Sequence, residues 1–275
     1  MIQETNRAAA DRRFDRLGRL VGDDCLALLA RAHVMVVGVG GVGSWAAEAL
    51  ARSGIGSITM VDFDHVCITN FNRQVMATEG MVGSPKAEMM AARLRSINPQ
   101  ASITVMPLFY SAETAAEVFA AKPDLVIDAI DSVGSKCHLL HQCVARGIPV
   151  VSSCGSGGRR DPTRIEIGDL SETKHDALAQ AVRKLLRKTY AFPAAGKGPF
   201  GIRSVFSTEP MTMPVPLAYD EGKGIRCVCT EKSDVFTCED RTVIMGTSCA
   251  VTGAFGFACA AEALRLLLNC ERSAR

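Results

Sequence analysis

The sequence predicts an α/β protein with a Rossmann-like sheet and helices on both faces of that sheet. Short apolar runs alternate with helical patterns in the first half of the chain, which is typical of a parallel sheet with right-handed crossovers. A glycine-rich turn follows the first apolar run, and acidic residues stand at the ends of two others. We expect the sheet to be parallel in its N-terminal part and less regular in the C-terminal half.

The expected strands are short apolar or β-branched runs, and the expected helices lie between them. The first strand is HVMVVG and the second is SITMVD. TRIEIGDL at 163–170 alternates between polar and apolar residues and opens the less regular half. The expected strands of the parallel part, these two included, lie near 33–38, 57–62, 102–106, 124–128 and 149–153. The expected helices lie near 41–53, 84–97, 111–121, 133–146 and 176–188, and a Pro/Gly loop lies at 191–201.

Composition indicates one domain in a reducing compartment. The chain has 275 residues, of which 48% are hydrophobic, enough to bury one sizeable core. Its 11 cysteines have no regular spacing, which favours free thiols. The N-terminus lacks a long apolar segment, and the apolar stretch 247–268 contains Glu262 and Arg265, so it reads as a buried helix. We therefore expect a cytoplasmic protein without membrane insertion; association with an organelle stays open.

A glycine-rich turn follows the first expected strand. Gly38, Gly40 and Gly43 fit G-x-G-x-x-G, and Ser44 begins the next helix. Glycines let the backbone approach a phosphate, and the helix N-terminus offers free N–H groups. The alternative is a strand–helix turn without a ligand. Strand, glycines and helix in register favour nucleotide binding, without separating NAD from ATP.

Acidic, carboxamide and basic side chains follow the second strand. Asp62 at the strand end suits ribose hydroxyls or caps the next turn. The segment ITNFNRQ then contains Asn70, Asn72, Arg73 and Gln74 within five positions. Arg73 fits the phosphates of ATP, and an asparagine fits the α-phosphate or a backbone turn. This cluster favours ATP over NAD, because an NAD site does not require such a group of carboxamide and basic side chains near the pyrophosphate.

Two further charged groups lie near expected helix starts. Lys86 begins an amphipathic helix, where a lysine is unfavourable for the helix dipole and so indicates an anionic partner or a solvated side chain. Asp131 follows the buried strand PDLVID, at the edge where ligands of open α/β sheets bind. It is a candidate Mg²⁺ ligand, and Asp128 could be a helix cap.

The combination GxGGxGS, DxDxVxxxNxxRQ, the PKA lysine and the DAIDS acid resembles the ubiquitin-activating-enzyme-like adenylating family, which includes bacterial activators of sulfur-carrier proteins. The resemblance implies a site that adenylates a carboxylate with ATP. It implies catalytic roles for Arg73, Lys86 and Asp131, with Mg²⁺ on Asp131, and a homodimer in which Arg16 reaches the partner's nucleotide. The implied nucleotide contacts are Gly38, Gly40, Gly41, Gly43, Ser44, Asp62, Asp64, Asn70, Arg73, Lys86, Asp131, Ser132 and Arg16.

Other segments resemble one branch of that family, the dehydratases of threonylcarbamoyladenosine in tRNA. These segments are SWAAEALARSGIG, SSCGSGGRRDPTRIEIGDLSET, SVFSTEP and TGAFGFACAAEAL. The sulfur-carrier activators often hold zinc with two CxxC pairs, whereas here Cys227-x-Cys229 is the nearest spacing. The resemblance implies a single adenylating domain over 1–275, with a helical arm at 1–32, a nucleotide-binding core at 33–153 and a substrate-binding half at 154–275.

A basic segment is the candidate tRNA contact. The net charge is only +2, but 171–203 is rich in lysine and arginine. Together with the family resemblance, this predicts phosphate contacts from Arg183, Lys184, Arg187 and Lys188. The alternative is a solvated helix face.

Several alternatives stay open on the sequence alone. Cys137, His138 and His141 share one helix and favour packing over a metal site. Cys238 or Cys249 could serve as a nucleophile. The rival functions are activation of a ubiquitin-like or sulfur-carrier protein, with such a protein as partner, an NAD-dependent dehydrogenase, and a non-catalytic nucleotide sensor or tRNA scaffold.

Overall fold

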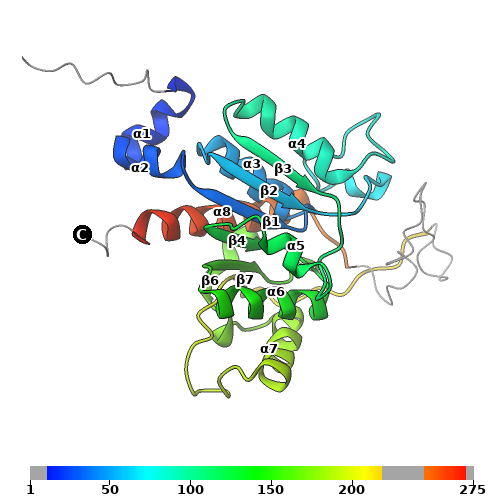
Figure 1. The fold of residues 1–275 in the computed structure, drawn as a ribbon. Helices are drawn as coiled ribbons and strands as arrows, with labels where there is room; N and C mark the ends of the chain where they lie inside the picture. The colour runs from blue at the N-terminus through cyan, green and yellow to red at the C-terminus, as the bar shows by residue number, and fades with distance from the viewer. Residues whose placement is uncertain (1–10, 219–244, 271–275) are drawn as a thin grey trace, which may run out of the picture.

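A mostly parallel sheet forms the centre of the computed structural model, which describes residues 11–218 and 245–270 (Figure 1). Within these residues the sheet has seven strands in the order β3-β2-β1-β4-β5-β7-β6. All neighbours pair in parallel except β6 and β7, which are antiparallel. The strands are β1 His33–Val37, β2 Ser57–Val61, β3 Ser102–Met106, β4 Leu125–Asp128, β5 Val150–Ser153, β6 Ile165–Asp169 and β7 Arg203–Ser207. The predicted fold class is confirmed.

Helices cover both faces of the sheet because the central strands are apolar on both sides. Val34 and Val36 of β1 belong to one core cluster, whereas Met35 and Val37 belong to the other. The first cluster is completed by α3 Gly43–Arg52, α4 Lys86–Ile97 and α8 Cys249–Cys270, and the second by α5 Ala115–Phe119, α6 Val133–Arg146 and α7 Ala177–Tyr190. Two short helices, α1 Asp15–Val21 and α2 Asp23–Leu29, precede β1. Figure 1 shows them beside the amino ends of the central strands.

Two elements differ from the expectation. The sequence did not predict β7, which inserts between β5 and β6. Its buried serines, Ser204 and Ser207, interrupt the apolar pattern that would have marked it. The helix expected at 111–121 begins only at Ala115, because the Thr114 hydroxyl accepts a bond from Ser111 N and donates to Phe109 O, which holds a turn there.

The apolar C-terminal segment forms α8. By length and composition alone, this helix could cross a membrane. In the fold, Val251, Phe255, Cys259 and Ala263 are buried, and α8 packs against α3 and the strands of the C-terminal half. The structure thus places it as a core helix, as the sequence predicts.

Candidate nucleotide-binding site

The turn between β1 and α3 can be built only with glycine at two positions. Gly38 has φ +89°, and a Cβ there would lie 2.8 Å from the Ala129 carbonyl oxygen. A Cβ on Gly43 would lie 1.8 Å from the Gly38 carbonyl oxygen. At Gly41 the nearest atoms belong instead to the Arg73 side chain, 3.2 Å from a would-be Cβ. The loop therefore presents its backbone at the N-terminus of α3, with Arg73 against it.

Asp62 connects the glycine loop with the segment that follows β2. Its Oδ2 accepts a hydrogen bond from Val39 N at 2.6 Å, and its Oδ1 accepts one from Asp64 N at 2.9 Å. Burial raises the pKa of the Asp62 carboxyl group, and the Lys86 ammonium opposes that shift. The observed bonds are those of a strand-end cap, and they also fix the carboxylate beside the loop where a ribose contact is predicted.

Lys86 lies inside the site rather than on the surface. Its side chain is buried, and Nζ lies 2.7 Å from Asp64 Oδ2. The backbone supports the same pairing, because Lys86 N donates to Asp64 O at 2.9 Å. The alternative of a solvated lysine is wrong. The structure thus brings Asp62, Asp64 and Lys86 together at the carboxyl end of β2.

The carboxamide segment holds Arg73 from two sides. Arg73 Nη1 donates to Thr69 O at 2.8 Å and to Asn72 Oδ1 at 3.1 Å. Asn70 is buried, and its Oδ1 accepts from Cys67 N at 2.9 Å, so its side chain holds a backbone turn. Ser44 is also buried, with its Oγ 3.4 Å from Val75 N.

A buried ion pair that sequence reasoning missed supports the turn carrying Asp131 and Ser132. Lys136 Nζ lies 2.7 Å from Asp128 Oδ2 and donates to Ile130 O at 3.0 Å. Both charged side chains are at most 1% exposed, and Ser152 Oγ also donates to Asp128 at 2.7 Å. Asp131 itself is exposed, and Ser132 immediately precedes α6. The sequence does contain a signal for this pair. An expected buried strand ends in an aspartate, and the helix that follows has a lysine in its first turns.

Arg16 does not reach this site within its own chain. It lies on α1, and nearby Phe14 packs against Gly54, which follows the C-terminal end of α3. The glycine loop is at the opposite end of that ten-residue helix, roughly 15 Å away at 1.5 Å per residue. A role for Arg16 at the nucleotide therefore requires a second subunit.

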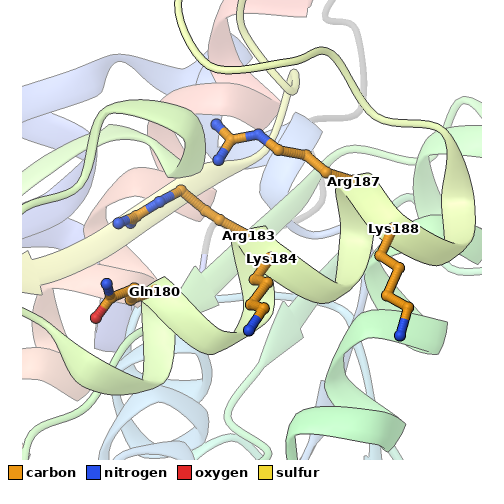
Figure 2. A pocket seen from close by; sticks show the side chains of 5 residues that line it. All are labelled: Gln180, Arg183, Lys184, Arg187 and Lys188. Carbon is orange, nitrogen blue, oxygen red and sulfur yellow. The ribbon is translucent and has the colours of Figure 1, made fainter.

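The predicted basic face forms one side of α7 (Figure 2). Gln180, Arg183, Lys184, Arg187 and Lys188 line a pocket of about 540 Å³. Lys184 and Lys188 are exposed, whereas the arginines are half-buried. Arg183 bonds the Thr173 hydroxyl, and Arg187 donates to Pro193 O and lies over the Phe200 ring. The two lysines are therefore the more available charges.

The side chains Cys137, His138 and His141, considered above for a metal site, pack within the fold. The His138 ring bonds Tyr110 OH at 3.0 Å, and His141 stacks on Tyr190. Burial raises the pKa of the Cys137 thiol to about 12. Within residues 11–218 and 245–270, no three His, Cys, Asp or Glu side chains group to hold a metal. Cys249 is exposed at the start of α8; Cys227, Cys229 and Cys238 lie outside the described residues.

Comparison with known proteins agrees with this geometry. The chain is 42% identical over 256 residues to the tRNA threonylcarbamoyladenosine dehydratase of Escherichia coli (strain K12), covering 93% of each chain. It is 47% identical over 175 residues to the enzyme of the same name from Bacillus subtilis (strain 168), covering 64% of this chain and 69% of the relative. The E. coli dehydratase crystallised with ATP superimposes with a TM-score of 0.82 at 40% identity, covering 95% of this chain and 96% of that one.

The family follows from a match that spans nearly the whole sequence. The sequence profile of the ThiF family matches residues 14–275. This match runs from α1 through the glycine loop, the carboxamide segment and α8. The predicted resemblance is confirmed, and the chain belongs to the ThiF family.

Proposed function

We propose that this protein is an ATP-dependent enzyme that dehydrates threonylcarbamoyladenosine in tRNA by adenylating its threonyl carboxylate. The observation that carries the proposal is the grouping of Arg73, Lys86 and Asp62 around the glycine loop. Relatives that cover the same length and bear that activity in their names support the choice of substrate.

The chemistry solves a leaving-group problem. A carboxylate is a poor electrophile because oxide would have to leave. Attack of a carboxylate oxygen on the α-phosphorus of ATP forms an acyl adenylate and releases pyrophosphate. A nucleophilic atom of the neighbouring carbamoyl group then attacks the acyl carbon, loses its proton and closes a ring as AMP departs. The net result is loss of water from the nucleoside, with one carboxylate oxygen leaving in AMP.

The residues of this chain supply positioning and charge. Backbone N–H groups at the start of α3 face the phosphates, and Arg73 and Lys86 offset charge that develops during transfer. Asp62 is held where ribose hydroxyls would approach. We assign the remaining predicted contacts to the same nucleotide site: Gly40, Gly41, Ser44, Asp64, Asn70 and Ser132. Catalysis in such a site rests on orientation and charge neutralisation.

Magnesium fits the site as a nucleotide-bound ion. Mg²⁺ on nucleotides takes one or two carboxylates and fills its other positions with phosphate oxygens and water. Asp131, exposed on the turn after β4, suits such a ligand. When bound there, the ion would withdraw charge from the phosphates.

The tRNA is expected on the basic side of α7. Its lysines project from one face of the helix (Figure 2), and backbone phosphates are the natural partners of such a face. We assign residues 154–275 to substrate binding, 33–153 to the nucleotide and 1–32 to a helical arm of one domain. The bacterial relatives that bear this activity in their names support a cytoplasmic location.

We also propose a two-fold homodimer. Its support is the position of Arg16, which lies far from its own glycine loop on an exposed part of α1. An arginine at that end of α3 could complete only another subunit's site. Light scattering at micromolar protein should give a dimer; a fully active monomer would remove both the dimer and the role of Arg16.

Pyrophosphate release with defined substrates tests the function. We expect release with ATP and tRNA carrying threonylcarbamoyladenosine, and none with tRNA lacking the modification. Release only with a carrier protein that ends in a free carboxylate would favour the alternative, an activator of ubiquitin-like or sulfur-carrier proteins. Thermal stabilisation by NAD equal to that by ATP with Mg²⁺ would instead favour a dehydrogenase.

A further inference from the structure

A second glycine-rich loop stands at the same edge of the sheet as the nucleotide loop. It follows β5 and contains Gly155, Gly157 and Gly158. Because β1, β4 and β5 are consecutive parallel neighbours, their carboxyl ends lie in a row. From β2 outward, this row carries Asp62, the nucleotide loop, the Asp131 turn and then the second loop. The second loop therefore lies on the side of the site away from the predicted ribose contact.

The second loop is connected to Arg73 through the segment that precedes α8. Gly158 has φ +71°, and its N–H donates to Gly246 O at 2.8 Å. A Cβ on Gly157 would lie 2.9 Å from Met245 Cβ. One residue past Gly246, Thr247 O accepts a bond from Asn72 Nδ2 at 2.9 Å. Asn72 in turn accepts a bond from Arg73 Nη1 at 3.1 Å, so hydrogen bonds link the loop to the side chain expected at the phosphates.

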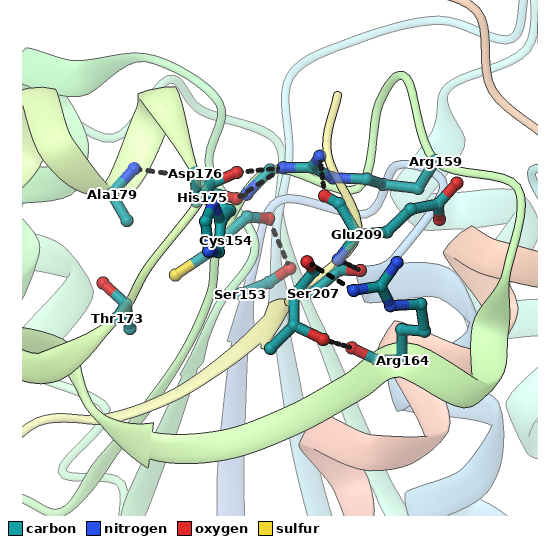
Figure 3. A network of polar contacts seen from close by, with 12 residues as sticks. Ser153, Cys154, Arg159, Arg164, Thr173, His175, Asp176, Ala179, Ser207 and Glu209 are labelled. Atoms are coloured by element: carbon teal, nitrogen blue, oxygen red, sulfur yellow. Dashed lines mark hydrogen bonds and ion pairs between the residues drawn. The ribbon is translucent and has the colours of Figure 1, made fainter. Parts of the chain in front are cut away.

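A buried arginine fastens the other side of this loop (Figure 3). Arg159 is 3% exposed, and its guanidinium donates to Glu209 O and, at 2.6 Å, to His175 O. It also lies 4.0 Å from the carboxylate of Asp176. Its fork of donors thus joins three segments: the loop after β5, the residue before the cap of α7, and the segment after β7.

Asp176 joins the loop to the basic helix directly. Its Oδ2 accepts from Gly155 N at 2.9 Å, and its Oδ1 accepts from Ala179 N at 2.7 Å, capping α7. Its side chain is as deeply buried as that of Arg159. One carboxylate therefore fixes both the start of the second glycine loop and the start of the helix expected to hold RNA.

We propose that Arg159 and Asp176 are positioning residues that hold loop 155–158 as the acyl-substrate side of the adenylation site and tie it to α7. This role rests on the function proposed above. The tRNA bound on α7 must present one carboxylate to the α-phosphate, so the distance between helix and nucleotide loop has to be fixed. The pair fixes it without contacting ATP.

The variants Arg159→Met and Asp176→Asn test this role, with Arg164→Met as matched control. Methionine removes the donor fork while keeping most of the length, and asparagine keeps an oxygen for the helix cap. The exposed Arg164 donates its guanidinium hydrogen bond to Thr208 O, beside the same segment after β7, rather than to the loop. Each variant is compared with the parent in pyrophosphate release, in KM for ATP and for modified tRNA, and in amide hydrogen exchange.

We expect kcat to fall by about 10²-fold in Arg159→Met and Asp176→Asn, because small misplacements of reacting groups cost that much. Both KM values should stay within about twofold of the parent, and Arg164→Met should match the parent. Exchange at 155–158 should accelerate while exchange at 38–43 does not.

Two outcomes would overturn the positioning role: a kcat that is unchanged in the two variants, with or without a raised KM for tRNA, or an equal loss of kcat in the Arg164 control. If the parent itself releases no pyrophosphate with modified tRNA, the proposed function fails and the role fails with it. If the parent is active and Arg159→Met and Asp176→Asn are equally active, the positioning role is refuted while the proposed function stands.

Discussion

Lys86 Nζ lies 2.7 Å from Asp64 Oδ2, with the lysine side chain 8% and the aspartate side chain 45% exposed. The ammonium is thus held at the carboxyl end of β2 by a carboxylate that still meets solvent. An incoming phosphate can share or replace that partner without moving the lysine. This arrangement explains why a lysine stands in the first turn of α4, where the helix dipole disfavours it.

Removal of either cation should slow adenylation. We expect Lys86→Met and Arg73→Ala each to reduce pyrophosphate formation by about 10²-fold or more, because each loses a charge partner of the transition state. The matched control is Lys122→Met. This lysine is exposed and precedes β4, so it lies at the amino ends of the strands, away from the site. The single tryptophan, Trp45, donates to Arg73 O at 2.9 Å, so its fluorescence can report ATP binding. A parental rate in Arg73→Ala would remove that residue from the site.

The pair Asp128–Lys136 should dominate local stability. Lys136→Met leaves a buried, unpaired carboxylate and should lower the free energy of unfolding by about 3–5 kcal/mol. The double variant Lys136→Met/Asp128→Asn removes that charge and should be less destabilised than the single one. Urea unfolding measures both. A single variant as stable as the parent would show that the ion pair contributes little.

Glu262 should make stability depend on pH. Burial opposes its ionisation, but hydrogen bonds from Arg265 and Arg203 outweigh burial and hold its pKa below the usual 4.5. The unfolded chain therefore takes up this proton first as pH falls, so the stabilisation is complete above 4.5 and disappears as pH drops through the lowered folded value. Glu262→Gln should cost about 1–2 kcal/mol at pH 7. Chemical denaturation at pH 7 and pH 3 checks this, and a constant difference would contradict it.

Exposed lysines of α7 should set the salt dependence of RNA binding. Lys184→Gln/Lys188→Gln should weaken tRNA binding and reduce the log–log salt slope by up to about 2, since each lost phosphate contact removes about 0.9. The arginines are left in place because they also anchor the loops after and before α7. Arg31→Gln/Lys122→Gln, at the amino edge of the sheet, is the matched control. If the lysine double variant binds tRNA as the parent does at every salt concentration, the basic side of α7 is a solvated face and not an RNA contact.

The sequence allowed the sheet, the glycine loop and the residues around it to be predicted, because each depends on a local pattern. Strand β1 is an apolar run and β2 a run of apolar and β-branched residues, and Gly38 and Gly43 follow the G-x-G-x-x-G spacing directly after β1. Features that depend on distant partners were not predictable. The buried serines of β7 interrupt the apolar pattern that would have predicted a strand. The buried ion pair of Lys136 becomes apparent only when the fold places Asp128 beside it.

The hydrogen bonds of Arg159 were likewise not predictable from a local sequence pattern. Its acceptors, Glu209 O and His175 O, come from segments 50 and 16 residues away in the chain. In the sequence, Arg159 is simply one of two adjacent arginines after a glycine-rich stretch. No local pattern distinguishes it from Arg160, which donates its backbone N–H to Glu209 instead.

Oxygen transfer tests the central claim most directly. Modified tRNA carrying oxygen-18 in its threonyl carboxylate is converted with ATP in a single turnover, and the nucleotide products are analysed by mass spectrometry. Adenylation predicts one heavy oxygen in AMP and none in pyrophosphate, because the carboxylate oxygen that attacks the α-phosphorus leaves with it. Heavy oxygen in inorganic phosphate together with ADP, or unlabelled AMP, would contradict adenylation of the threonyl carboxylate.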